Sequence, residues 1–187
     1  MLRISILLVL MLNTNFVFSQ NNKSQSAEKQ GFLFGVGVGG GVLLEKDTGI
    51  DMENYGKYSF LNLKLGWMIA PKTAICLHIP SGGHKEKGKT RAFEAVLATS
   101  QHWFSERIWG MAGLGLAMNM PPFYETEEDD PKFYFGLALS TGLGYELLQK
   151  GRFALDIQTR CLYGNYDIET VKRQSTAFDI LIGFNWY

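Results

Sequence analysis

The segment FYFGLALSTGLGYEL, residues 133–147, decides the fold of this chain. Its odd positions are mostly large and apolar, from Phe133 and Phe135 to Leu147, whereas its even positions are mostly glycine, alanine or serine. A period of two is that of a β-strand, and a helical stripe would be incoherent. A glycine face weakens a strand unless bulky neighbours crowd it. The pattern therefore predicts a strand with one face against lipid and the other inside a narrow, crowded barrel.

The length of this segment suits a membrane-crossing strand. At about 3.3 Å per residue it spans roughly 50 Å, and a tilt near 45° leaves about 35 Å, enough to cross a bilayer core. Weaker versions of the same alternation recur along the chain and predict eight strands: 32–44, 60–67, 73–79, 91–100, 108–118, 133–147, 153–163 and 175–187. The predicted fold is all-β, an eight-stranded antiparallel up-and-down transmembrane β-barrel.

The start of the chain predicts export. Residues 1–19 carry one positive charge, Arg3, followed by the apolar run 4–12, which is typical of a cleavable secretory signal peptide. A retained membrane anchor is the alternative, but this run is too short to span a bilayer. Residues 20–30, QNNKSQSAEKQ, then form a polar periplasmic leader, and residues 31–187 form the barrel domain.

Composition limits the possible functions. The 18 basic residues balance the 18 acidic ones, and no basic patch indicates binding to nucleic acid. Two cysteines are too few for a disulfide framework. Beyond the signal peptide no apolar run is long enough for a transmembrane helix.

The eight-strand pattern and the aromatic ending FNWY, residues 184–187, resemble the small outer-membrane barrels of the OmpA and OmpX type over residues 31–187. The resemblance implies a Gram-negative outer membrane, contact with its lipids and lipopolysaccharide, and an insertion machinery that recognises the C-terminal strand. Such barrels keep long loops outside. The long predicted connections 45–57, 80–90, 119–132 and 164–174 therefore assign both termini to the periplasm. One departure is that the lipid-facing parity ends on Trp186, which leaves Tyr187 on the other parity and indicates a local bulge or another branch of the class.

A soluble lipocalin-like barrel is the main alternative fold. It would keep its apolar face around a ligand and show polar residues outside, whereas the second face here is rich in glycine with sparse charges.

Charged side chains at inward positions predict a polar network in the lumen. Unpaired charges are costly in so narrow an interior, so we expect the network to be mutually satisfied around Arg160 and Lys64. It would act as a structural plug, with a gated ion path as the alternative, because side chains normally fill an eight-stranded interior. The predicted lumen residues are Lys64, His78, Glu94, Glu146, Asp156, Arg160 and Asp179.

The sequence predicts neither an enzyme nor a cofactor or metal site. Outer-membrane lipid A deacylases resemble this chain in barrel size and carry a lipid-facing His-x-Ser pair, in which the histidine activates the serine. None of His78, His84 and His102 has a serine two residues later, and we expect His84 in a loop and His102 in a turn. No spaced Asp-x-Asp calcium loop is present.

Two predicted loops carry opposite charge. We expect these charges to be solvated and screened, or else the loops to attract each other or bind a partner or cation-bridged lipopolysaccharide. The basic residues are Lys85, Lys87 and Lys89; the acidic ones are Glu125, Glu127, Glu128, Asp129 and Asp130.

The sequence thus favours a non-enzymatic outer-membrane barrel with a structural or interaction role, engaging a partner or the envelope through its loops or its wall. An accessory subunit of a larger outer-membrane complex and a lipid A-modifying enzyme are the alternatives. A small-solute channel ranks third.

Overall fold

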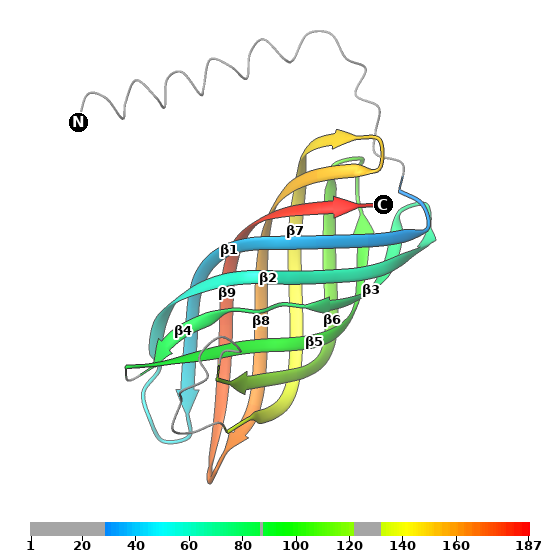
Figure 1. Cartoon of the computed structure of the whole chain (residues 1–187). Helices are drawn as coiled ribbons and strands as arrows, with labels where there is room; N and C mark the ends of the chain where they lie inside the picture. Colours follow the sequence, from blue (N-terminus) through cyan, green and yellow to red (C-terminus); the bar gives the residue numbers. More distant parts are fainter. Residues whose placement is uncertain (1–28, 87, 122–131) are drawn as a thin grey trace, which may run out of the picture.

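Nine antiparallel strands make up most of residues 29–86, 88–121 and 132–187, the part of the chain that the computed structural model describes (Figure 1). Within these residues, no helix is long and apolar enough to span a bilayer. The strands are β1 (Phe32–Asp47), β2 (Glu53–Ala70), β3 (Thr73–Ile79), β4 (Gly83–Glu86), β5 (Lys89–Trp103), β6 (Ile108–Met120), β7 (Tyr134–Lys150), β8 (Phe153–Ile168) and β9 (Val171–Trp186).

The nine strands close into an eight-membered barrel. Apart from β3 and β4, consecutive strands pair with each other, and β1 closes the ring by pairing with both β2 and β9. Both β3 and β4 lie between β2 and β5, so they are two segments of one wall strand. Residues 80–82 interrupt that strand at Pro80, which has no backbone N–H to donate. The predicted eight-stranded up-and-down barrel is confirmed.

The strands are longer than the sequence analysis predicted. The expected loop 164–174 is a hairpin in which β8 and β9 pair from Tyr166 with Arg173 up to Ile168 with Val171. Likewise β1 and β2 extend into the expected loop 45–57, and β4 and β5 fill most of 80–90. Backbone pairing does not require apolar side chains, so the polar composition of these stretches does not mark where the strands end.

The two faces of the wall differ as the alternation predicts. Large apolar side chains such as Phe135, Leu139 and Ile182 are exposed on the outside, whereas small or polar side chains are buried inside. Register shifts mark three bulges, one of them between Met68 and Ala70 at the end of β2. The other two change the parity within a strand. Phe60 and Leu61 both point outward, with a φ of 55° at Leu61, and so do Leu147 and Leu148. The regular alternation predicted for 60–67 therefore breaks at Phe60.

The C-terminal strand has no bulge. Trp186 is exposed and pairs in register with Phe34 and Phe153, and Tyr187 follows it with a fully buried side chain. The last aromatic residue therefore belongs to the lumen because the alternation simply continues.

Glycine on the inner face makes room for bulky side chains. A Cβ atom at Gly144 would lie 2.2 Å from the Trp109 ring, and one at Gly164 would lie 2.7 Å from the Phe93 ring. The glycines thus leave room in the lumen for large side chains of a neighbouring strand, as for Trp109, or of a more distant strand, as for Phe93.

The barrel has two different ends (Figure 1). The chain enters the barrel at Gly31 and leaves it at Tyr187 at the terminal end, where the turns 71–72 and 151–152 also lie. The hairpins β1–β2, β4–β5 and β8–β9 extend the opposite end, called the hairpin end below.

Candidate functional site

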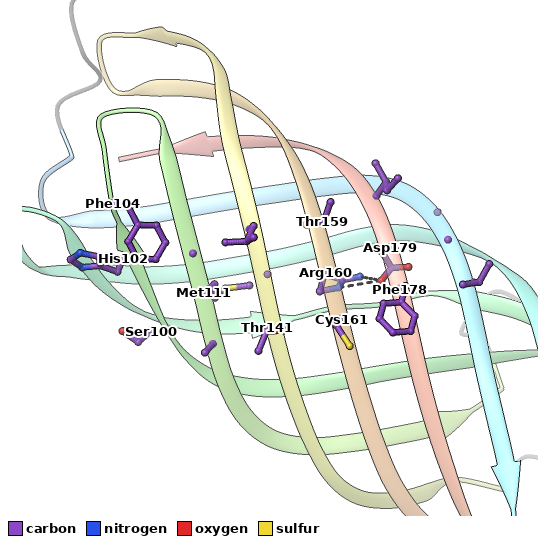
Figure 2. A pocket seen from close by; sticks show the side chains of 18 residues that line it. Ser100, His102, Phe104, Met111, Thr141, Thr159, Arg160, Cys161, Phe178 and Asp179 are labelled. Atoms are coloured by element: carbon purple, nitrogen blue, oxygen red, sulfur yellow. Dashed lines mark hydrogen bonds and ion pairs between the residues drawn. The ribbon is translucent and has the colours of Figure 1, made fainter.

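A buried ion cluster crosses the middle of the lumen. Arg160 on β8 and Asp179 on β9 are register partners, and Asp179 Oδ2 lies 2.5 Å from Arg160 Nη2 (Figure 2). Asp179 Oδ2 also lies 3.0 Å from Lys57 Nζ. Arg160 also donates to Asn62 Oδ1 at 2.6 Å and to Ser59 Oγ at 3.1 Å. These five residues are called the deep cluster below. In it, two cations share one carboxylate, and neutral oxygens accept the remaining hydrogen bonds.

A second layer lies between the deep cluster and the terminal end. Lys64 Nζ donates to Gln101 Oε1 at 2.7 Å and lies 4.7 Å from the centre of the Trp109 ring. Trp109 Nε1 in turn donates to Asp156 Oδ2 at 3.1 Å, and Asn185 Nδ2 donates to the same oxygen at 2.8 Å. Lys64 thus binds within its own layer, and the structure does not join it to Arg160 in one network.

Glu146 closes the terminal end. Its side chain is fully buried and accepts hydrogen bonds from Trp103 Nε1 and Tyr187 Oη, both at 2.7 Å. Lys29 Nζ lies 3.2 Å from the Glu146 carboxylate and about equally close to the Trp103 and Tyr187 rings, at 5.5 and 5.4 Å. The last residues of the predicted leader therefore cover the lumen, a contact that the polar composition of residues 20–30 did not indicate.

Glu94 does not face the lumen. On β5 the inward positions are Phe93, Ala95 and Leu97, all fully buried, so Glu94 lies on the outward face. Its carboxylate accepts a hydrogen bond from Ser81 Oγ at 2.6 Å, within the interruption of the wall between β3 and β4. The expectation that Glu94 faces inward is wrong, because the short predicted strand gave no clear parity. The other six predicted residues point inward: Lys64, His78, Glu146, Asp156, Arg160 and Asp179.

At the hairpin end, a further group of charges fills the mouth of the lumen. Arg173 Nε and Nη2 donate to the two carboxylate oxygens of Asp47 at 2.7 and 2.8 Å. Arg173 Nη1 lies 3.1 Å from Glu45 Oε2 and 2.9 Å from Glu86 Oε1. His84 lies beside these groups and is buried. We call Glu45, Asp47, His84, Glu86 and Arg173 the mouth cluster.

Sequence reasoning missed the mouth cluster because it assigned all five residues to loops. The mouth cluster could have been predicted from the period-two alternation, which continues through the polar residues at the strand ends. In β9, for example, Arg173 and Ser175 keep the inward parity of Asp179.

The predicted loop charges fall into two groups. Lys85 lies on β4 and Lys89 on β5, and both are exposed. The remaining predicted loop charges lie outside the described residues: Lys87, Glu125, Glu127, Glu128, Asp129 and Asp130.

The outer wall carries a shallow groove of about 990 Å³ (Figure 2). Its floor includes a row of small side chains that are register partners across β5 to β8, namely Ser100, Ala112, Thr141 and Cys161. Larger apolar side chains flank this row, so the lipid-facing surface is hollowed here.

Ser100 and His102 lie on this outer surface. Both are exposed residues of β5, two positions apart on one face and therefore roughly 7 Å apart along the strand. His102 Nδ1 is 3.0 Å from Thr73 Oγ1, and its ring contacts Phe104 edge-on (Figure 2). The expectation that His102 lies in a turn is wrong, because β5 continues to Trp103.

The similarity to known proteins is structural. No protein-family model matches the sequence, and comparison with curated protein sequences gives no match. The solved structure of Ail, the attachment invasion locus protein of Yersinia pestis, is similar with a TM-score of 0.52 and 16% identity, covering 84% of this chain and 99% of Ail. Neisserial surface protein A has a TM-score of 0.56 and 14% identity, covering 84% of this chain and 97% of that protein. The chain therefore has the fold of small outer-membrane β-barrels such as these two, and at such low identity the likeness concerns the fold alone.

Proposed function

We propose that this protein resides in an outer membrane as a closed barrel, and that it acts by contact with the envelope at its hairpin end. The observation that carries the proposal is the filling of the lumen. The deep cluster, the layer of Lys64 and the buried Glu146 at the terminal end succeed one another along the barrel. We infer that together they leave no path for a solute.

The outer surface fits a lipid environment. Exposed apolar side chains surround the barrel, including Phe34, Leu65, Leu114, Leu137 and Phe178. An apolar surface of this extent would be unfavourable in contact with water. In contact with lipid, it is the apolar band that is typical of an outer-membrane barrel.

The hairpin end offers cations to an anionic surface. Lys46, Lys85 and Lys172 are exposed there, and each lies on the outward parity of its strand. With the hairpin end outside the cell, they would lie where lipopolysaccharide carries its phosphates. A lysine near an anionic membrane surface contributes about 1 kcal/mol of binding free energy. Lipopolysaccharide phosphate is therefore the ligand class that we propose.

A matched pair of triple and double variants tests this function. Purified protein with Lys46→Gln, Lys85→Gln and Lys172→Gln should bind lipopolysaccharide micelles on the order of 10- to 100-fold more weakly at low salt. The control, Lys72→Gln with Lys150→Gln, removes exposed lysines of the terminal end and should leave the affinity unchanged. Equal losses in both proteins, or no loss in either, would contradict the proposal.

The outer groove favours a second candidate function, hydrolysis of a lipid ester. An imidazole can activate a serine hydroxyl, and here Ser100 and His102 share one face beside an apolar groove suited to an acyl chain. The contact between Thr73 and His102 Nδ1 would leave Nε2 to act as the base.

The test of this candidate is release of fatty acid from phospholipid vesicles that contain the protein. Activity abolished by Ser100→Ala and by His102→Ala, but retained by Ser105→Ala in the nearby turn, would support the enzyme. Wild-type protein that releases no fatty acid would exclude ester hydrolysis.

A further inference from the structure

The mouth cluster holds more negative than positive charge. Among the described residues, the carboxylates of Glu45, Asp47 and Glu86 all contact one guanidinium, that of Arg173, and Asp47 has a further interaction of its own. Two other cations of the described inner face nearby have their own contacts, since Lys57 binds Asp179 and Arg91 donates to Asn119 Oδ1 at 2.7 Å. The surplus is mostly buried, and Glu45 is only 4% exposed. Buried carboxylates in excess favour an additional cation.

His84 is a buried side chain without a hydrogen-bond partner. It is 1% exposed, and among the described residues neither Nδ1 nor Nε2 forms a hydrogen bond. Leaving a buried polar group unpaired costs about 1–3 kcal/mol. The ring packs against Tyr55, with the ring centres 5.4 Å apart, and Nε2 lies 4.0 Å from Glu45 Oε2. The imidazole is thus held at the edge of the carboxylates with a free lone pair.

The potential ligand atoms of three residues converge. One atom each from Glu45, His84 and Glu86 lies within 4.8 Å of the other two. Metal–ligand bonds of about 2.0–2.2 Å require the ligand atoms to approach one another slightly further. Glu86 lies beside the β4–β5 turn, so a small movement of its side chain could provide this contraction.

We propose that Glu45, His84 and Glu86 form a binding site for a divalent cation of borderline softness, represented by Zn²⁺. One imidazole nitrogen with two carboxylates suits zinc better than calcium, which prefers six or more oxygen ligands. The proposal is independent of lipopolysaccharide binding.

Arg173 can give way to the metal without losing its own anchor. Its Nη1 occupies the space between Glu45 and Glu86, whereas its Nε and Nη2 form the two-point contact with Asp47. A metal would therefore replace only the Nη1 contacts. Ser175 Oγ donates to Glu45 Oε1 at 2.8 Å and would orient this carboxylate from outside the ligand set.

The structural effect of the metal would be to clamp the mouth. Glu45 belongs to β1, whereas His84 and Glu86 belong to β4, which is the shortest strand of the wall. Because β1 and β4 both pair with β2, the cation would connect the β4–β5 hairpin to β1 over the inner face of β2 and fix this side of the mouth.

Isothermal titration calorimetry tests the site: untagged, EDTA-treated wild-type protein in detergent is titrated with ZnCl₂. We expect uptake of one Zn²⁺ per chain. His84→Gln or Glu86→Gln should raise the dissociation constant for Zn²⁺ at least about tenfold, because replacing even a residue that only orients a metal ligand weakens binding by about that factor. His102→Gln and Glu106→Gln are the matched controls, being an exposed histidine and an exposed carboxylate at the terminal end, and should keep wild-type affinity.

Absence of saturable Zn²⁺ uptake by the wild-type protein would overturn the proposal, as would equal losses in the control variants or uptake of Ca²⁺ alone. Co²⁺ binding to the wild-type protein keeps the test valid if a variant fails to fold. We expect the intense visible absorption of four- or five-coordinate Co²⁺. If the spectrum is that of hydrated Co²⁺, the proposed site is wrong.

Discussion

The deep cluster and the mouth cluster are opposite in charge balance. In the deep cluster two cations, Lys57 and Arg160, share the carboxylate of Asp179, whereas in the mouth cluster three carboxylates share Arg173. The deep cluster meets its excess of donors with oxygens of Asn62 and Ser59. The mouth cluster instead contains an imidazole without a hydrogen-bond partner among the described residues. The two clusters have similar polar content, but the deep cluster is typical of structural filling, whereas the mouth cluster is typical of a binding site.

The largest expected effect is the loss of the shared carboxylate. Asp179→Asn leaves Lys57 and Arg160 buried without a counter-charge, and breaking a buried ion pair in this way costs about 3–5 kcal/mol. The free energy of unfolding in urea, measured in lipid vesicles, reports this cost. Glu86→Gln is the matched control, because Arg173 keeps two other carboxylates, and it should cost far less. Equal costs would remove the distinction between the two clusters.

Zinc should stabilise the wild-type barrel through the mouth cluster alone. At a free Zn²⁺ concentration 100 times the dissociation constant, a single site that binds only the folded state adds about 2.7 kcal/mol. The same urea titrations with and without Zn²⁺ measure this gain. Asp179→Asn should retain the gain and His84→Gln should lose it. The reverse pattern would place the metal in the deep cluster.

The crowding of the lumen can be tested at Gly144, between the deep cluster and the terminal end. Gly144→Val introduces atoms where a Cβ alone would lie 2.2 Å from the Trp109 ring, and overpacking of this kind costs about 1–3 kcal/mol. Gly56→Val on β2, where a Cβ meets nothing within 4 Å, is the control and should be nearly neutral. If both variants unfold at the wild-type urea concentration, the lumen is less crowded than described.

The smallest effect concerns an exposed pair outside the membrane-spanning part. The hydrogen bond from Lys132 and its positive charge lower the pKa of Glu169, which lies in the turn between β8 and β9. A lowered pKa stabilises the folded state at pH values above the ordinary pKa of glutamate, and the contribution disappears as the pH falls through the lowered value. Lys132→Gln should return the pKa of Glu169 toward its ordinary value in a carboxyl NMR titration. An unchanged titration would show that the pair does not form in solution.

The sequence allowed the barrel to be predicted because a two-faced wall must alternate along each strand. The alternation of Phe135, Leu137 and Leu139 with Gly136 and Ala138 requires little beyond local geometry. The strand ends were missed for the opposite reason. Past the apolar belt, both faces are polar, and only cross-strand pairing such as Asp167 with Lys172 shows that the sheet continues.

The candidate site was less predictable for two physical reasons. One extra residue at a bulge reverses the faces, as at Phe60, and a weak alternation leaves the parity open, as at Glu94 on the continuous strand β5. The mouth cluster also joins residues far apart in the chain, with Glu45 and Arg173 separated by 128 positions. The spacing of residues in the sequence gives no sign of such a convergence.

Ion conductance across planar bilayers containing the purified full-length protein tests the central claim most directly. A lumen closed by the deep cluster, the layer of Lys64 and the buried Glu146 should give no conductance steps above those of protein-free bilayers. Regular steps in the wild-type protein that Arg160→Ala changes in size would show an ion path through the lumen and contradict the account.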